Sequence, residues 1–512
     1  MKEFFRKYAY ITRIIIAGLL LAVSQPNPLI PGYFGWHPPT ILCWMSATML
    51  FLPMIAEKKR TAFWSVWSIL LIYYLVNVTW VSLFGEGFLG ILLWLGLPLA
   101  ISVYTALAVF IAVRTRVIYR PIVFALSMAG VEWLREQGIF GFAWAQIGMG
   151  QAEGSFIKIA SLGGINLITF ITLWLCGEVV MHYHTRGKTR RMLIAAAITT
   201  GTLLSAAFIV TNRPSVGTPI TVTVVQPSTA IGLTPADLVS PTTTEEMNKL
   251  IEHEKVREET LRVLSTKAPI MSQKSMIVWS ESSLGQPPYL SWVNEICRSK
   301  NAWLLCGSPM IDNEGVFRNT AFLMNETSYI EIAKYDKIHL VPFGEFVPFR
   351  KFVEKNFQVR GNDIIPGKQR FVFDQTGHPF GVGICFESVQ PDISRWYASH
   401  GAKTLYFITN DAWFHTTPAI QQHFNQSRYR AIENGLPVVR CASTGISGFI
   451  SPNGDVIDQI PVNEKAILTA NILPGPANTP YTKFGWLFGP LALLASIILA
   501  VIYRERRALK DV

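Results

Sequence analysis

The chain has 512 residues, of which 50% are hydrophobic and only 15% are charged, and its mean hydropathy is positive. Soluble domains carry about 25% charged residues, so this composition excludes a chain made only of soluble domains and indicates membrane segments. The net charge of +11 does not indicate a nucleic-acid partner, because residues 218–472 hold 23 Lys+Arg against 25 Asp+Glu and the basic excess lies around the apolar runs instead.

Eight apolar runs predict membrane-spanning helices, most of them near the length of about 20 residues that a bilayer requires. Two of the runs are weak. The first contains Arg13 and follows Lys2, Arg6 and Lys7, so the sequence leaves open whether it is a span or a cleaved signal peptide. The fifth is interrupted by Glu132 and Arg135, which we expect at the membrane interface. We therefore predict seven or eight spans, from the runs 11–23, 40–56, 63–84, 88–113, 121–134, 156–181, 192–210 and 484–503.

Basic residues fall on alternate connections between these runs, which predicts their orientation. The basic connections lie near residues 58–60, 114–120 and 186–191, and a further basic segment follows residue 503. The connections 24–39, 85–87 and 135–155 hold few positive charges. We expect the basic sides to be cytoplasmic and residues 1–212 to end on the opposite side, so that residues 218–472 form an extracytoplasmic domain and residues 480–512 a final span with a short basic cytoplasmic tail.

Strand-like and helix-like stretches alternate within residues 218–472. The strand-like runs are 220–226, 276–280, 302–307, 381–385 and 404–410, and the clearest helices are Glu245–Leu264 and 419–434. Strands that alternate with helices predict an α/β domain whose sheet is covered by helices.

The six cysteines do not form a disulfide pattern, and no CxxC pair or Cys/His cluster has zinc spacing. We therefore expect no metal and no cofactor. Cys43 and Cys176 lie inside apolar runs, which leaves four thiols for chemistry: Cys297, Cys306, Cys385 and Cys441.

Three stretches of the domain place reactive groups where a buried strand ends, the usual place for a site on an α/β sheet. They are MIVWSES with Glu281, YDKIHLVPFGEFVP with Lys337 and Glu345, and GVGICFES with Cys385 and Glu387. Taken singly, each residue is better explained by core packing, for Cys385, or by a surface or strand-end charge, for Lys337 and Glu281. Together, a thiol, a carboxylate that accepts its proton and a cation that stabilises an oxyanion meet the needs of nucleophilic catalysis.

Glu, Lys and Cys in this order, with the strings YDKIHLVPFGEFVP (335–348), TNDAWF (409–414) and QQHFNQSRYRAIENGLPVVR (421–440), resemble the nitrilase, or carbon-nitrogen hydrolase, superfamily. Within it, the chain resembles the membrane-bound apolipoprotein N-acyltransferase family over essentially its whole length. The resemblance implies a multi-span α-helical membrane domain and an α/β nitrilase-like domain, an αββα sandwich, on the periplasmic side of the bacterial inner membrane.

The resemblance also implies the roles of the site residues. Cys385 corresponds to the nucleophile, Glu281 to the general base and Lys337 to the cation beside the tetrahedral intermediate. The backbone N–H of Phe386 corresponds to a second oxyanion donor, while Glu345 and Glu387 orient the lysine and the loop around the nucleophile. The chain departs from the family where Phe386 replaces a common Tyr, where Ser280 replaces a common Pro, and in residues 227–244, which contain no Trp.

The implied reaction passes an acyl chain from a phospholipid, phosphatidylethanolamine in our interpretation, through a Cys385 thioester to the N-terminal α-amine of a diacylated apolipoprotein. We expect a monomer in which apolar residues form a lid that keeps water from the thioester. The candidates for the lid or for substrate contact are Phe343 to Phe349, Phe357, Asn410, Trp413 and Phe414. Two alternatives remain: a membrane-tethered amidase or nitrilase that hydrolyses a small substrate, and a transporter or scaffold whose outer domain only binds a ligand.

Overall fold

The computed structural model describes residues 2–30, 40–56, 58–84, 88–152, 154–215, 217–229, 244–284, 290–311, 316–327, 332–356, 363–415 and 417–505. The chain divides into two compact units. One, the helical unit, comprises Met1–Asn212, Thr417–Gln422 and Thr479–Val512, and the other, the sheet unit, comprises Arg213–Thr416 and His423–Asn478.

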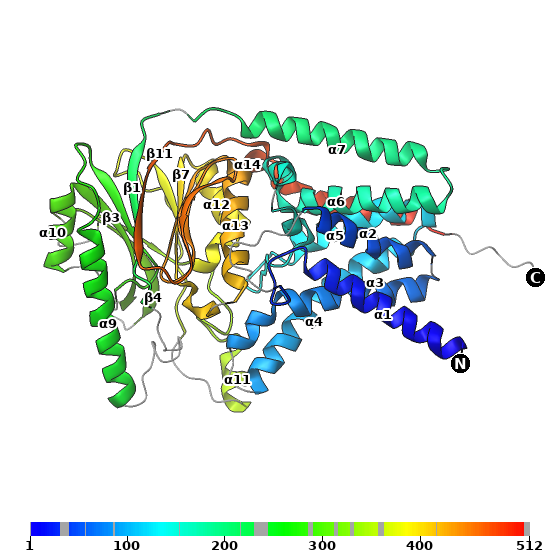
Figure 1. Ribbon diagram of the computed structural model, residues 1–512, viewed down its shortest axis with the longest axis horizontal. Helices are drawn as coiled ribbons and strands as arrows, with labels where there is room; N and C mark the ends of the chain where they lie inside the picture. Colours follow the sequence, from blue (N-terminus) through cyan, green and yellow to red (C-terminus); the bar gives the residue numbers. More distant parts are fainter. Residues whose placement is uncertain are drawn as a thin grey trace, which may run out of the picture. The chain divides into compact units, whose positions relative to one another are not determined.

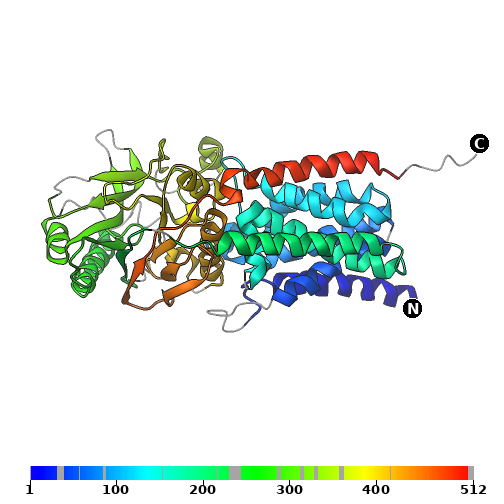
Figure 2. The same cartoon turned by 90° about the horizontal axis from the view of Figure 1, so that it is seen from above.

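Each of the eight apolar runs coincides with a helix of the helical unit, and Figure 2 shows these helices running side by side. Among the described residues, five helical segments are long and apolar enough to cross a membrane: Phe88–Val113, Val117–Leu134, Ser155–His184, Arg190–Thr211 and Gly485–Ile502. Tyr8–Ala22 and Thr40–Ile55 are apolar but shorter. A multi-pass membrane protein is therefore supported, and the count of seven or eight spans stays a prediction. The helices are α1 (Lys2–Ala22), α2 (Thr40–Ala56), α3 (Lys59–Asn77), α4 (Phe88–Val113), α5 (Arg120–Leu134), α6 (Ala160–His184), α7 (Arg190–Thr211), α14 (Pro480–Lys483) and α15 (Phe488–Ile502).

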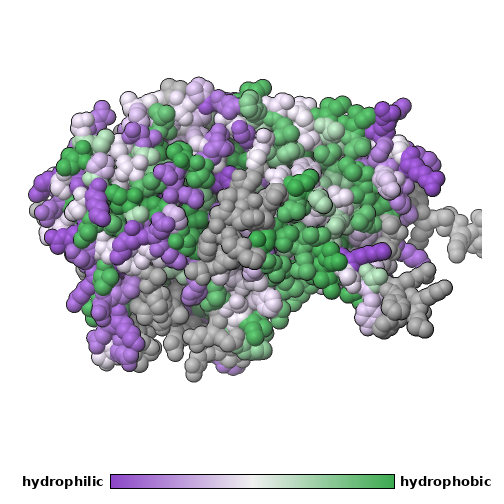
Figure 3. Space-filling model, viewed as in Figure 1, coloured by the Kyte–Doolittle hydropathy of each residue, from purple (hydrophilic) through white to green (hydrophobic). Residues whose placement is uncertain are grey.

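Large apolar side chains cover the outer face of these helices. Val103 on α4 is 68% exposed, Ile209 on α7 is 69% exposed and Val501 on α15 is 71% exposed. Figure 3 shows the apolar surface over the helical unit, whereas hydrophilic side chains dominate the visible face of the sheet unit. An apolar surface of this extent is unfavourable in water and is the surface that lipid chains solvate.

Glu132 and Arg135 are both buried inside the helical unit, and their place at the membrane interface stays a prediction. The Glu132 carboxylate accepts hydrogen bonds from Thr169 Oγ1 at 2.6 Å and from the backbone N–H of Ile147 at 2.8 Å. Arg135 donates to the carbonyl oxygen of Trp144 at 2.7 Å. Both side chains thus satisfy backbone groups of the segment after α5, which offsets the cost of burying their charges.

The strands in the described part of the sheet unit form two sheets. One has six strands in the order β11-β1-β2-β3-β4-β5, and the other has five in the order β10-β9-β8-β7-β6. Strands β1, β2 and β3 are parallel, as are β6, β7 and β8, and the outer strands are antiparallel. The strands are β1 (Ile220–Gln226), β2 (Ser275–Trp279), β3 (Ala302–Ile311), β4 (Phe317–Met324), β5 (Ala333–Asp336), β6 (Phe380–Ile384), β7 (Thr404–Thr409), β8 (Val438–Ala442), β9 (Ser447–Ile450), β10 (Val456–Ile460) and β11 (Ala466–Ile472).

The two sheets pack face to face over a shared apolar core, to which Val224 and Val278 contribute from one sheet and Val382 and Ile408 from the other. A second core joins the outer face of the six-stranded sheet to helices α9 (Thr244–Ser265) and α10 (Ser291–Lys300). Helices α12 (Pro391–Ser399) and α13 (Ala419–Asn434) lie beside the five-stranded sheet (Figure 1). This arrangement confirms the predicted αββα sandwich. The short helix α11 (Arg350–Asn356) belongs to the connection between β5 and β6.

Candidate active site

Cys385 lies at the point where β6 ends and begins the 3-10 turn Cys385–Ser388. Its φ of +53° is in the left-handed region, a conformation that costs a residue other than glycine about 1–3 kcal/mol unless the surroundings hold it. The thiol residue is 8% exposed, so it is nearly enclosed. A strained, enclosed cysteine at the carboxyl end of a parallel strand has the position that a nucleophile requires on this kind of sheet.

Glu387 holds this turn in place from within. Its Oε2 accepts the backbone N–H of Ile384 at 2.8 Å, and its Oε1 accepts the Tyr335 hydroxyl at 2.7 Å and the N–H of Ile338 at 2.8 Å. Burial raises the pKa of Glu387, while these hydrogen bonds oppose the shift. The carboxylate therefore ties the cysteine turn to the segment that carries Lys337.

Lys337 is 1% exposed and is paired with two carboxylates. Its Nζ lies 2.8 Å from Glu345 Oε1 and 3.4 Å from Glu281 Oε1. Asn319 on β4 donates to the same two oxygens, at 2.7 Å to Glu281 and 3.1 Å to Glu345. Burial alone would lower the pKa of Lys337, but Glu345 and Glu281 outweigh it and raise the pKa, so the ammonium keeps its charge.

Glu281 follows β2 and is 5% exposed. The backbone N–H of Asn410, at the end of β7, donates to its Oε2 at 2.7 Å. Because β2 belongs to one sheet and β7 to the other, this bond fixes the carboxylate at the junction of the two sheets. Gly307 lies directly against it: a Cβ on Gly307 would stand 2.6 Å from the Cα of Glu281.

The thiol of Cys385 is in electrostatic range of both Glu281 and Lys337. Burial raises its pKa, Glu281 raises it further, and Lys337 and a hydrogen bond with Thr409 act in the opposite direction. The resting thiol is therefore protonated at neutral pH, and the reaction needs a base to remove the proton as the sulfur attacks. The structure brings together all three residues that the sequence predicted for this purpose.

The candidate lid residues differ in their surroundings. Phe343 and Phe349 have positive φ angles and are 51% and 76% exposed, so they lie at the surface. Phe414 is buried, with its ring edge-to-face against His423 at 5.6 Å, and Trp413 is half-buried. Phe357 lies outside the described residues, as does most of the 227–244 segment. The role of a lid stays a prediction.

Several residues of the site were not predicted individually. Asn319, Thr409 and Tyr335 contact the predicted groups, and Asp411, His423 and Arg440 form a buried polar cluster beneath the cysteine turn. Asp411, His423 and Arg440 lay within the strings that carried the family resemblance, but no spacing rule singles them out. Only the fold shows that three segments from different strands and helices converge there.

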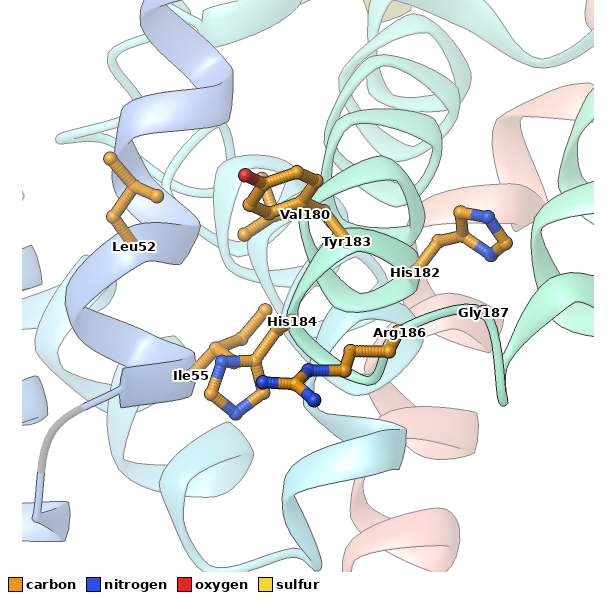
Figure 4. A pocket seen from close by; sticks show the side chains of 8 residues that line it. All are labelled: Leu52, Ile55, Val180, His182, Tyr183, His184, Arg186 and Gly187. Carbon is orange, nitrogen blue, oxygen red and sulfur yellow. The ribbon is translucent and has the colours of Figure 1, made fainter.

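A surface hollow of about 850 Å³ lies elsewhere, at one end of α6, between that helix and α2. Figure 4 shows the side chain of Arg186 extending toward the ring of His184 near Ile55. The described residues that line it include neither a thiol nor a carboxylate, so they provide no nucleophile with a base.

Two family patterns match the chain. The carbon-nitrogen hydrolase family matches residues 270–476, and the N-terminal domain of apolipoprotein N-acyltransferase matches residues 17–177. Among solved structures, yeast Nit3 of the nitrilase superfamily is 18% identical, covers 51% of this chain and 93% of its own, and gives a TM-score of 0.36.

Curated relatives are similar over nearly the full length. The apolipoprotein N-acyltransferase of Geobacter metallireducens is 28% identical over 97% of this chain and 95% of its own. Those of Caulobacter vibrioides and Vibrio vulnificus are 27% and 24% identical over 96% and 90% of this chain, and over 93% and 92% of their own. With a multi-pass helical unit, an αββα unit and both family patterns in one chain, this protein is an enzyme that is similar over nearly its full length to the apolipoprotein N-acyltransferases.

Proposed function

We propose that this enzyme transfers an acyl chain from a membrane phospholipid, phosphatidylethanolamine in the first instance, to the N-terminal α-amine of the diacylglyceryl-cysteine of an apolipoprotein. The observation that carries the proposal is the buried set of Cys385, Glu281 and Lys337, in which the base and the cation are fixed by Asn410, Asn319 and Glu345. The names of the full-length relatives support the choice of acceptor.

In the first step, Glu281 takes the thiol proton and the sulfur of Cys385 attacks the ester carbon of the phospholipid. The oxygen that becomes negative is stabilised by the ammonium of Lys337 and the backbone N–H of Phe386. The carbon–oxygen bond to the glycerol then breaks, the leaving oxygen takes the proton from Glu281, and lysophospholipid departs. The product is a thioester on Cys385.

In the second step, the acceptor amine attacks the thioester carbon and gives a proton to Glu281. The same two donors stabilise the second tetrahedral intermediate. The carbon–sulfur bond breaks, the sulfur recovers the proton, and the amide product leaves. Because the pKa of Cys385 is raised, the departing sulfur takes the proton back from Glu281, and the enzyme returns to its protonated resting thiol.

The two-unit architecture has a physical reason under this proposal. Both substrates are anchored in lipid, and transferring a fatty chain into water costs on the order of 10 kcal/mol at about 0.8 kcal/mol per CH₂. The chain enters the sheet unit from α7 and leaves it toward α15, so both ends of the unit are tethered to apolar helices. We place the unit on the periplasmic side of the inner membrane, and we propose that the enzyme acts as a monomer.

The proposal is tested by incubating the purified enzyme with phosphatidylethanolamine labelled in one acyl chain and a synthetic diacylated lipopeptide. Label on the lipopeptide α-amine is expected, and Cys385→Ala should form none. Release of the label as free fatty acid, with hydrolysis of a soluble amide, would instead identify a hydrolase. Full activity of Cys385→Ala would reject the proposed nucleophile.

A further inference from the structure

The peptide unit between Cys385 and Phe386 is held from its carbonyl end. The carbonyl oxygen of Cys385 accepts a hydrogen bond from Ser388 Oγ at 2.9 Å and lies 3.2 Å from His423 Nε2. A trans peptide is planar, so its C=O and its N–H point in opposite directions. Groups that fix the Cys385 carbonyl therefore also fix the direction of the Phe386 N–H, the second oxyanion donor of the proposed reaction.

His423 is itself held on its other side by a buried ion pair. Its Nδ1 lies 2.9 Å from Asp411 Oδ1 and 3.0 Å from Arg440 Nη2. Arg440 Nη2 also donates to Asp411 Oδ2 at 2.9 Å, and Thr409 Oγ1 donates to Asp411 Oδ1 at 2.9 Å. Asp411, His423 and Arg440 are all fully buried, so this geometry is not averaged by water.

The neighbours of the ring select one position for its hydrogen. Burial and the Arg440 charge lower the pKa of His423, so the ring is neutral and carries one N–H. A hydrogen on Nε2 suits three contacts: the Cys385 carbonyl and the Ser388 hydroxyl can accept it, and Nδ1 can accept from Arg440. Of the four printed contacts of the ring, only that between Nδ1 and Asp411 Oδ1 then joins two acceptors. A hydrogen on Nδ1 suits only Asp411 and Ser388, and Asp411 already receives hydrogen bonds from Arg440 and Thr409. The contacts therefore favour the hydrogen on Nε2.

We propose that His423 is a positioning residue: its Nε2–H, together with Ser388, holds the Cys385 carbonyl so that the Phe386 N–H points at the developing oxyanion. This inference rests on the proposed function, because it assigns a purpose to the same site. Asp411 and Arg440 act one step further away, by keeping the ring in this orientation.

Two amide replacements separate the ring nitrogens. His423→Gln presents an N–H near the position of Nε2, whereas His423→Asn reaches only the position of Nδ1. In the phospholipid-to-lipopeptide assay, we expect kcat to fall roughly a hundredfold in His423→Asn, as for the loss of an oxyanion donor, with KM little changed. His423→Gln should restore most of that loss. Ser388→Ala should lower kcat in the same direction and provides a second test if His423→Asn does not fold.

Alkylation of Cys385 by iodoacetamide distinguishes positioning from general damage to the site. Alkylation uses the same thiolate but forms no oxyanion at a carbonyl, so its rate should be unchanged in His423→Asn. The matched control is His400→Asn, since that ring is exposed and stacked on Trp396, and it should leave both reactions unchanged. Equal losses of alkylation and transfer in His423→Asn, or no rescue by His423→Gln, would overturn the inference. If the wild-type enzyme releases the acyl chain as free fatty acid and labels no lipopeptide, the proposed function itself fails, and this outcome is distinct from both.

Discussion

At the scale of single residues, Glu281 has two opposite effects on the Cys385 thiol, and one substitution separates them. Glu281 serves as the base of the proposed reaction, yet its negative charge is also one of the causes that raise the pKa of the Cys385 thiol. A raised pKa means less thiolate at a given pH. The resting site therefore keeps its thiol protonated, and in the proposed reaction Glu281 takes the proton only as the sulfur attacks a substrate.

We predict that iodoacetamide alkylates Cys385 faster in Glu281→Gln than in the wild type at the same pH. The pKa of the thiol should fall in the variant, because the neighbouring negative charge is removed while Lys337 remains. Transfer from phospholipid should nevertheless fall by about 10²–10⁴-fold, the usual contribution of a general base. The measurement is the pH dependence of iodoacetamide labelling of the Cys385 peptide, beside the transfer assay. Slower labelling of the variant at all pH values would contradict this account of the thiol.

Glu345 is the closer partner of Lys337, and its charge decides where the ammonium lies. Glu345 accepts a hydrogen bond from Lys337 with one carboxylate oxygen and from the Val341 N–H with the other. The amide of Glu345→Gln has only one oxygen and can keep only one of these two bonds, so the lysine should move toward Glu281. We expect kcat to fall about a hundredfold with a small change in KM, as for misplacement of a catalytic group. Glu326→Gln, which removes a surface carboxylate paired with Lys274, is the control and should be neutral. Equal effects of the two substitutions would argue against a positioning role for Glu345.

At the scale of elements, the close contact between β3 and the segment after β2 places the base. Gly307→Ala would put a Cβ 2.6 Å from the Cα of Glu281 and 2.9 Å from the backbone nitrogen of Ser282. Backbone cannot move aside as a flexible side chain can, so we expect about 1–3 kcal/mol of destabilisation and loss of transfer. Thermal unfolding and activity measure the two effects. Gly201→Ala on α7 has open space around it and should be unchanged; an active, stable Gly307→Ala would show that this contact is not needed.

The elements that could be predicted from the sequence are those with a strong local signal. The continuous apolar runs of β1, β2, β6 and β7 and the long polar helix α9 were predicted nearly to the residue, because strands buried on both faces and amphipathic helices have distinct patterns. The antiparallel strands β10 and β11 were not, since their residues are largely half-buried or exposed and lack a continuous apolar run. The burial of Glu132 was not predicted either, because its partners Thr169 and Ile147 are distant in sequence.

The same limit applies to the site. Glu281, Lys337 and Cys385 could be proposed from the sequence because each follows a recognisable strand or lies in a distinctive string. Asn319, in contrast, lies on an antiparallel strand, and only the sheet register brings it to both carboxylates. His423 lies on a helix and meets the cysteine turn only through the tertiary fold.

At the scale of the whole molecule, the alternation of basic connections predicts which side each unit faces. Alkaline phosphatase, which is active only outside the cytoplasm, should be active when fused after residue 214 and inactive when fused after residue 188, in the basic turn between α6 and α7. A fluorescent protein at the C-terminus should fold and fluoresce in the cytoplasm. The opposite pattern would place Cys385, the proposed nucleophile, in the cytoplasm and would exclude periplasmic apolipoproteins as acceptors.

The central claim is that Cys385 carries the acyl chain between the two lipid substrates. It is tested most directly by mass spectrometry of the enzyme after incubation with phospholipid alone. We predict that the Cys385 peptide gains the mass of one acyl chain, that Cys385→Ala and Glu281→Ala gain none, and that adding a diacylated lipopeptide removes the mass as the N-acylated product appears. An unmodified Cys385 thiol under conditions in which that product still forms would contradict the account.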